Sequence, residues 1–180
     1  MKLIETPIQG AYVIELEPRG DERGSFARAF CKKELAEHGV DFDIAQINLA
    51  NTKTAGTFRG FHYQVAPSKE AKLIRCTQGS LYDAIVDVRP DSPTFGKCFG
   101  TILSSENQVA MLIPANCAHG YMTLEDDTQA LYAAADFYNP PLERGFRHND
   151  PIVDLDWPTP PVHLSDKDQA WPDFQAEGQG

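Results

Sequence analysis

Apolar and polar residues alternate along much of the chain, and the alternation breaks at short polar turns. A period of two is typical of strands with one buried face, and clusters of Gly, Pro, Asn and Asp indicate the turns between them. Residues 32–38 have the clearest helical pattern, which Gly39 would end. The pattern predicts strands at residues 11–16, Ile44–Ala50, Thr57–Gln64, Lys72–Thr77, Ser80–Val88, Lys97–Leu103, Val109–Ile113, Gly120–Leu124 and Gln129–Tyr138.

The spacing of these strands indicates the fold class. Strands that recur every 8–12 residues or so, without helices between them, are typical of a sandwich or barrel and exclude a doubly wound α/β fold. After Pro140 the sequence becomes rich in proline, which predicts an irregular segment that wraps around the domain. We therefore expect a single all-β domain over residues 1–180, a jelly roll with a short helix, its core at about 43–138 and a C-terminal wrap at about 140–180.

Charge and composition narrow the function classes. The chain has 26 acidic and 16 basic residues, a formal net charge of −10 that disfavours nucleic acid as a partner. No apolar run approaches the ~20 residues of a membrane span, and the N-terminus does not read as a secretory signal. The cysteines show no metal-binding spacing, and because no export signal is recognised we expect reduced thiols in the cytoplasm; they are Cys31, Cys76, Cys98 and Cys117.

The strand predicted at Thr57–Gln64 carries the first candidate chemistry. Strict alternation would place Arg59 and His62 on opposite faces of the sheet. Gly60 lies between them and permits a bulge that would bring both side chains to one cavity. Lys72 begins the next predicted strand, so two cations and an imidazole would meet in one region of the sheet.

A metal site is the competing interpretation of this region. His62, Glu70 and His119 could supply three ligands. Small double-stranded β-helix proteins often hold a metal with two histidines one residue apart, and here Gln64 occupies the second of those positions. We therefore expect no metal.

The strand predicted at Gln129–Tyr138 offers a proton donor. Alternation would place Tyr132, Ala134, Asp136 and Tyr138 on one face, where the small Ala134 leaves room for a ligand. A phenol can donate a proton to such a ligand, although a packing role for the ring stays open.

The roles of two further residues, Asp83 and His119, depend on how the strands pack. Asp83 would share a face with Ile85 and Asp87, and an inward carboxylate needs a partner, for which a histidine is suited. His119 follows a predicted turn and would lie either at the rim of a cavity or inside it.

Taken together, motifs spread over residues 3 to 172 resemble the dTDP-4-dehydrorhamnose 3,5-epimerase family in order and spacing. The motifs are Asp21-Glu-Arg-Gly24, Arg59-Gly-Phe-His-Tyr-Gln64, Lys72-Leu-Ile-Arg75, Asp91-Ser-Pro-Thr-Phe-Gly96, Ile113-Pro114, Ala118-His-Gly120, Leu131-Tyr132, Tyr138-Asn-Pro140, Asn149-Asp-Pro151, Trp157-Pro158 and Leu164-Ser-Asp-Lys-Asp168. The resemblance implies a cupin-type double-stranded β-helix, a homodimer and no metal or organic cofactor. It also implies a nucleotide-diphosphate 4-keto-6-deoxy sugar as substrate, inverted at C3 and C5 in deoxysugar and cell-surface polysaccharide biosynthesis.

The same resemblance implies roles for single residues. His62 would be the general base, oriented by Asp168, and Tyr132 would be the acid on the opposite face of the sugar. Asp83 stays open as an alternative partner that orients His62. The enolate oxygen would be stabilised by Lys72, Arg59 and His119. Positions that bind the nucleotide, diphosphate or sugar are matched by Arg23, Gln46, Asn48, Tyr138, Glu143 and Lys167.

One residue departs from the family pattern and leaves alternatives open. Arg28 stands where the family usually has a glutamate in contact with the substrate, so the charge there is reversed and the nucleotide stays undetermined. The alternatives are a single-carbon epimerase acting on C3 or C5 of a different nucleotide sugar, a metal-dependent cupin enzyme and a non-catalytic sugar-binding domain.

Overall fold

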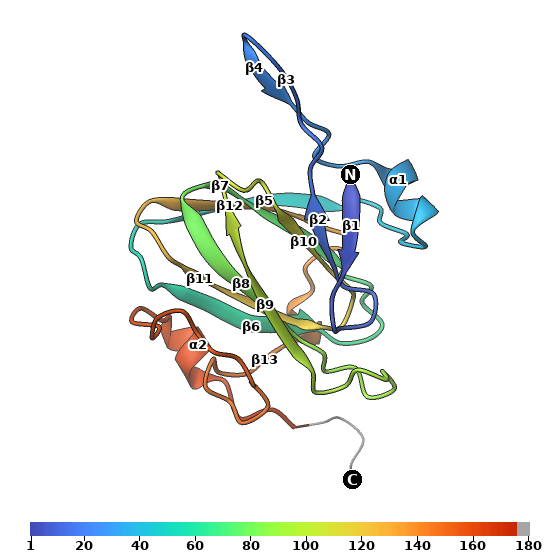
Figure 1. Ribbon diagram of the computed structural model, residues 1–180. Coiled ribbons are helices and arrows are strands. Elements are labelled where there is room, and N and C mark those ends of the chain that lie inside the picture. Colours follow the sequence, from blue (N-terminus) through green and yellow to red (C-terminus); the bar gives the residue numbers. More distant parts are fainter. Residues whose placement is uncertain (176–180) are drawn as a thin grey trace.

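Two antiparallel β-sheets face each other in the computed structural model, which describes residues 1–175 (Figure 1). The larger sheet has the order β1 (Lys2–Glu5), β2 (Tyr12–Glu15), β10 (Ala110–Ile113), β7 (Lys72–Gln78), β12 (Thr128–Ala134) and β5 (Gln46–Thr52). The smaller sheet has the order β13 (Glu143–Gly145), β6 (Phe58–Gln64), β11 (Ala118–Thr123), β8 (Ser80–Val86) and β9 (Cys98–Ser104). From β5 to β12 the chain passes repeatedly from one sheet to the other, which confirms the predicted all-β jelly roll.

The central strands agree with the predicted ones to within a few residues, and α1 (Lys32–Glu37) confirms the predicted helix. The prediction was wrong at the end of Gln129–Tyr138, because β12 stops at Ala134. The carboxylate of Asp136 accepts hydrogen bonds from the Ser68 hydroxyl and the Lys69 N–H, both at 3.0 Å, and from the N–H of the next residue. These bonds accompany a turn of the chain, so Asp136 and Tyr138 do not continue the strand that carries Tyr132.

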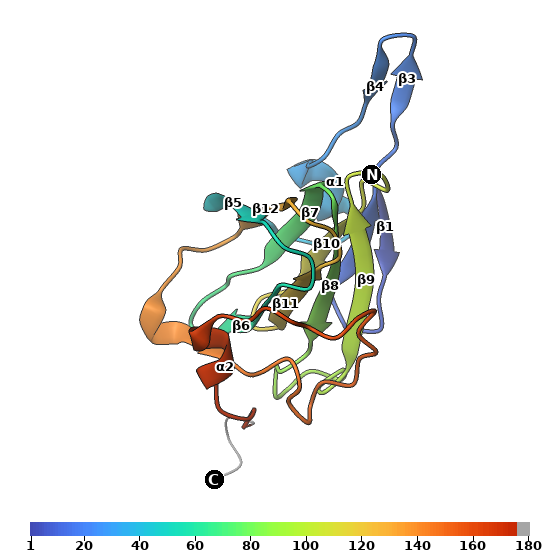
Figure 2. The ribbon, with the colours of Figure 1, turned by 90° about the vertical axis from the view of Figure 1, so that its left-hand side faces the viewer.

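Short elements outside the predicted core were missed. No strand was predicted between residues 17 and 31, but β3 (Arg19–Asp21) and β4 (Gly24–Phe26) form a hairpin that projects from the rest of the molecule (Figures 1 and 2). Other short elements are β1, β13, the 3-10 helix Pro140–Leu142 and α2 (Asp166–Ala170). Segments of three to five residues show too little periodicity to predict from sequence.

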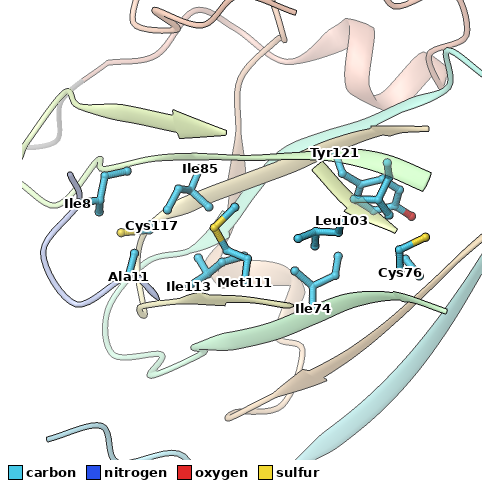
Figure 3. Close-up of a cluster of buried hydrophobic side chains, with 12 residues drawn as sticks. Ile8, Ala11, Ile74, Cys76, Ile85, Leu103, Met111, Ile113, Cys117 and Tyr121 are labelled. Carbon is cyan, nitrogen blue, oxygen red and sulfur yellow. The ribbon is translucent and has the colours of Figure 1, made fainter. Parts of the chain in front are cut away.

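The core lies between the sheets (Figure 3). Ile74 of β7 and Ile85 of β8 come from opposite sheets and belong to one buried cluster with Met111. The predicted alternation in Ser80–Val88 is confirmed: Ile85 faces this interior, whereas Ala84 packs in the cluster on the outer face of the smaller sheet.

The C-terminal segment covers that outer face, as predicted. Trp157 packs edge-on against Phe58 of β6, with ring centroids 5.3 Å apart. The Phe58 N–H donates to the carbonyl of His163 at 2.9 Å, so the returning chain lies against the start of β6. Residues 176–180 of the predicted wrap lie outside the described residues. Among the residues described, no helix is long and apolar enough to cross a membrane.

Candidate active site

A cavity of about 570 Å³ collects side chains from both sheets and from α2. β6 contributes Arg59 and His62, β11 contributes His119 and Tyr121, and the larger sheet contributes Lys72 and Tyr132. The C-terminal segment completes the wall with His163, Leu164, Ser165, Lys167 and Asp168. In both ribbon views α2 lies beside β6 (Figures 1 and 2).

A bulge in β6 places Arg59 and His62 in this one cavity, as predicted. His62 pairs with His119 and Arg59 with Tyr121, so three steps along β6 match two along β11. The irregularity is centred on Gly60, whose φ is +137°, a value that L side chains rarely adopt. Both the cation and the imidazole therefore reach the cavity wall.

The imidazole of His62 is held by a carboxylate. His62 Nε2 lies 2.5 Å from Oδ1 of Asp168, and the Asp168 N–H donates to the Ser165 hydroxyl at the start of α2. Burial raises the pKa of Asp168, but the hydrogen bonds from His62 and Ser165 outweigh it and hold that pKa below its ordinary value. An ionised Asp168 favours the tautomer with hydrogen on Nε2, which leaves the lone pair of neutral His62 on Nδ1.

A second histidine–carboxylate pair lies on the neighbouring strands. His119 Nε2 is 2.7 Å from Oδ1 of Asp83, which is completely buried. Burial raises the pKa of Asp83, and the nearby His119 and Lys72 oppose that rise. The structure thus gives Asp83 the histidine partner expected for it, but that partner is His119. The alternative in which Asp83 orients His62 is wrong, because Asp168 occupies that position.

Lys72 and Tyr132 come from adjacent strands of the larger sheet. Burial raises the pKa of the Tyr132 phenol, the charge of Glu70 raises it further, and Arg59 opposes both. The phenol is therefore protonated at neutral pH and can act as an acid. Lys72 Nζ forms an ion pair with Glu70 at 3.1 Å.

A second hollow of about 360 Å³ shares His62, Lys72 and Tyr132 with the cavity. Cross-strand pairing places Gln46 and Asn48 of β5 opposite Ala134 and Tyr132 of β12. The remaining polar residues of this hollow include Gln64, Glu70, Tyr138 and Glu143.

Three of the predicted ligand-binding residues form one cluster. The Tyr138 hydroxyl donates to Glu143 at 2.8 Å, and Lys167 Nζ lies 2.7 and 2.8 Å from the two oxygens of that carboxylate. Burial raises the pKa of Glu143, but Lys167 and Tyr138 lower it more, so it stays ionised. The cluster joins α2, which carries Lys167, to the second hollow.

Arg23 and Arg28 are not brought to the cavity by their own chain. Arg23 lies in the turn between β3 and β4, at the tip of the projecting hairpin, and is hydrogen-bonded to Asp21. Arg28 lies outside both hollows, and its Nη1 donates to Oε1 of Glu34 in α1 at 3.2 Å. Within one chain, neither residue lines the cavity or the second hollow, and their role in substrate binding stays a prediction.

Several cavity residues were missed by the sequence analysis. Tyr121 follows His119 by two residues, so alternation along one strand could have identified it. Glu70 was considered only as a metal ligand, although it precedes Lys72 by two residues. No local signal marks His163, and Leu164 and Ser165 were named only as part of a motif without a role; all three reach the cavity through the returning C-terminal segment. Across residues 1–175, no group of three or more His, Cys, Asp or Glu side chains is arranged to hold a metal ion.

Comparison with known proteins agrees with this geometry. The model of the family described as dTDP-4-dehydrorhamnose 3,5-epimerase matches residues 5–176. The chain belongs to this family. It is 39% identical to the dTDP-4-dehydrorhamnose 3,5-epimerase of Shigella flexneri, over 93% of each chain.

Solved structures of relatives show the same fold. The dTDP-4-dehydrorhamnose 3,5-epimerase of Elizabethkingia anophelis superposes with a TM-score of 0.93 at 37% identity, covering 97% of this chain and 96% of that one. ChmJ, a 3'-monoepimerase from Streptomyces bikiniensis in complex with dTDP-quinovose, has a TM-score of 0.84 at 32% identity, covering 92% of this chain and 84% of that one. The chain therefore has the cupin-type fold of this family and belongs to its enzyme class, the carbohydrate epimerases.

Proposed function

We propose that the chain inverts C3 and C5 of a dTDP-linked 4-keto-6-deoxy sugar, converting dTDP-4-dehydro-6-deoxy-D-glucose to dTDP-4-dehydro-L-rhamnose. One observation carries the proposal: a carboxylate-held imidazole, a protonated phenol and a lysine line the same cavity. Inversion next to a ketone needs a base, an acid and a cation near the ketone oxygen.

The first half of the reaction removes a proton. His62, oriented by Asp168, takes the proton from the carbon next to the C4 ketone, and the electron pair of that C–H bond moves onto the C4 oxygen. Lys72, Arg59 and His119 stabilise the enolate that forms. Donors placed where negative charge develops are usually a large part of the catalytic effect in such reactions.

The second half returns a proton to the opposite face. Tyr132 donates its phenolic proton to the carbon while the C4 ketone re-forms. The phenolate then recovers a proton from solvent, and His62 releases to solvent the proton it took. Each acid or base contributes roughly 10²–10⁴-fold in such reactions. The same two steps at C3 and at C5 give the doubly inverted product.

The second hollow supports a nucleotide-diphosphate site next to the sugar. Gln46 and Asn48 offer amide groups, while Tyr138, Glu143 and Lys167 form the hydrogen-bonded cluster beside them. Hydroxyl, amide and phosphate groups of a nucleotide find complementary partners in such a set.

Homodimerisation in the cytoplasm is part of the proposal. Phe26 at the end of the hairpin is 73% exposed, and Ile47 and Leu49 on the edge strand β5 are 61% and 54% exposed. Exposed apolar side chains on an edge strand and a projecting hairpin support contact with a second copy. In a dimer, Arg23 and Arg28 could contact substrate bound in the cavity of the second copy, which they do not reach in their own chain.

A single-carbon epimerase is the second candidate, because the chain also resembles a 3'-monoepimerase. Proton NMR of dTDP-4-dehydro-6-deoxy-D-glucose with the enzyme in D₂O separates the two. We expect deuterium and inversion at both C3 and C5. Exchange at one carbon alone would support the second candidate, and the absence of exchange at both would contradict the proposed function.

A further inference from the structure

A carboxylate without a role in the mechanism above lies at the centre of the site. Glu70 Oε2 is 3.1 Å from Lys72 Nζ, and the two side chains are only 10% and 13% exposed. Glu70 also lines the hollow that contains His62, Lys72 and Tyr132. The ion pair is thus largely shielded from water at the position where the enolate would form.

The backbone at Glu70 is fixed by its neighbours. Its N–H donates to the Ser68 hydroxyl at 3.2 Å, and that hydroxyl donates to Asp136 just after β12. The carbonyl of Ala71 accepts a hydrogen bond from the Ala135 N–H at 2.9 Å, which extends the pairing of β7 with the chain beyond β12. The Ala71 N–H donates to the carbonyl of Lys69 at 2.8 Å, so Glu70 lies in a tight turn just before β7, from which its carboxylate reaches Lys72.

A carboxylate partner can hold the ammonium group of a lysine in one position. Its side chain is long and flexible, and its ammonium is a compact charge without directional preference of its own. A shielded ammonium without a carboxylate partner would also lack compensation for the hydration it has lost. The carboxylate of Glu70 supplies both compensation and position.

We propose that Glu70 is a positioning residue, which holds the ammonium of Lys72 where the C4 oxygen of the substrate becomes negatively charged. This inference rests on the proposed function and adds a residue to its machinery. Glu70 contacts Lys72 and acts on the reaction through it. Its removal should slow enolate formation, and with it both exchange and inversion, while substrate affinity changes little.

A double-mutant cycle of Glu70→Gln and Lys72→Met tests this dependence. Glutamine keeps the size of the side chain and removes its charge, so the fold should hold. Exchange in D₂O and inversion are followed by NMR at high enzyme concentration, together with KM and Tm. We expect Glu70→Gln to lower kcat by about 10–100-fold, the scale on which small misplacements of a reacting group act. KM should stay within about two- to threefold, the ratio of inversion to exchange should be unchanged, and Glu70→Asp should restore part of kcat.

The second background decides between positioning and a merely structural role. With methionine at position 72, Glu70→Gln should have little further effect, because the partner through which it acts is gone. An equal loss in both backgrounds, or full activity of Glu70→Gln with lysine present, would overturn the inference. Glu106→Gln, an exposed carboxylate outside both hollows, is the matched control and should retain wild-type kcat.

Wild-type activity in the same assay separates this inference from the proposed function. A wild-type enzyme that neither exchanges nor inverts the sugar overturns both. An active wild type with unaffected Glu70 variants overturns only the role of Glu70.

Discussion

Replacing Gly60 with alanine tests whether the bulge in β6 positions the catalytic side chains. The backbone φ at Gly60 is +137°. A Cβ atom built there lies 2.4 Å from the Cα of Gly120 and 2.8 Å from the carbonyl oxygen of His119. Both neighbours are backbone atoms of β11, so neither can rotate away, and relief requires the two strands to separate.

The magnitude follows from two effects. A residue held in a sparsely populated backbone region costs of order 1–3 kcal/mol. Overpacking against fixed atoms costs a further 1–3 kcal/mol or so. We expect Gly60→Ala to lower the free energy of unfolding by about 2–6 kcal/mol, with about 2–4 °C of Tm lost per kcal/mol in a chain of this length. Separation of β6 from β11 would also move His62, and a displacement of about 1 Å can lower the rate by about 100-fold.

Gly96→Ala is the matched control. Gly96 also has a positive φ, +76°, but no atom lies within 4 Å of a Cβ built on it. In this variant the free energy of unfolding should fall only by the cost of backbone strain, about 1–3 kcal/mol, and kcat should be unchanged. Calorimetric Tm and initial rates of epimerisation measure both quantities. If Gly60→Ala were as stable and as active as Gly96→Ala, the close approach of β6 and β11 would not position His62.

Three further predictions concern metal, base and pH. Activity should survive exhaustive chelation, because Gln64 occupies the place of a second metal-binding histidine; loss with EDTA that one divalent ion restores would overturn this. His62→Asn should abolish hydrogen exchange and inversion, whereas Asp168→Ala should be milder since the imidazole remains; equal losses on kinetic assay would contradict the positioning role. Burial raises the pKa of Asp87, but hydrogen bonds from neighbouring groups outweigh it and lower that pKa to about 2. A depressed pKa contributes stability that is complete above the unfolded value of about 3.8 and is lost as pH falls toward 2. Denaturant unfolding should show a loss over that window that is about 2 kcal/mol larger in wild type than in Asp87→Asn.

The alternation along each strand predicted which side chains share a face wherever the strand is regular. Asp83 and Ile85 face the interior as the period of two requires. The bulge at Gly60 was also predictable, because glycine inside a strand pattern indicates such an irregularity. The end of β12 was not predictable, since it depends on hydrogen bonds from Ser68 and Lys69 to Asp136, more than sixty residues away.

Long-range placement limited the prediction of the site. Asp168 reaches His62 across 106 residues of chain, on a helix of five residues that no periodicity reveals. The resemblance to a family supplied that pairing, whereas the strand pattern alone offered Asp83 as a carboxylate partner for a histidine. For Arg23 and Arg28 the resemblance was not enough. A match to a motif identifies a position in the sequence, but it does not say how far that residue lies from the cavity of its own chain.

The central claim is that a base and an acid act on opposite faces of one sugar carbon. Tyr132→Phe tests it directly, because phenylalanine keeps the ring and its packing and removes only the proton donor. His62 would still form the enolate, and Lys72 would still stabilise it.

The measurement is NMR of the sugar nucleotide with Tyr132→Phe in D₂O. The account predicts deuterium at the reacting carbon with retained configuration, because His62 can return a solvent-derived proton only to the face from which it took one. Inversion at the wild-type rate would contradict the account and leave Tyr132 with a packing role alone.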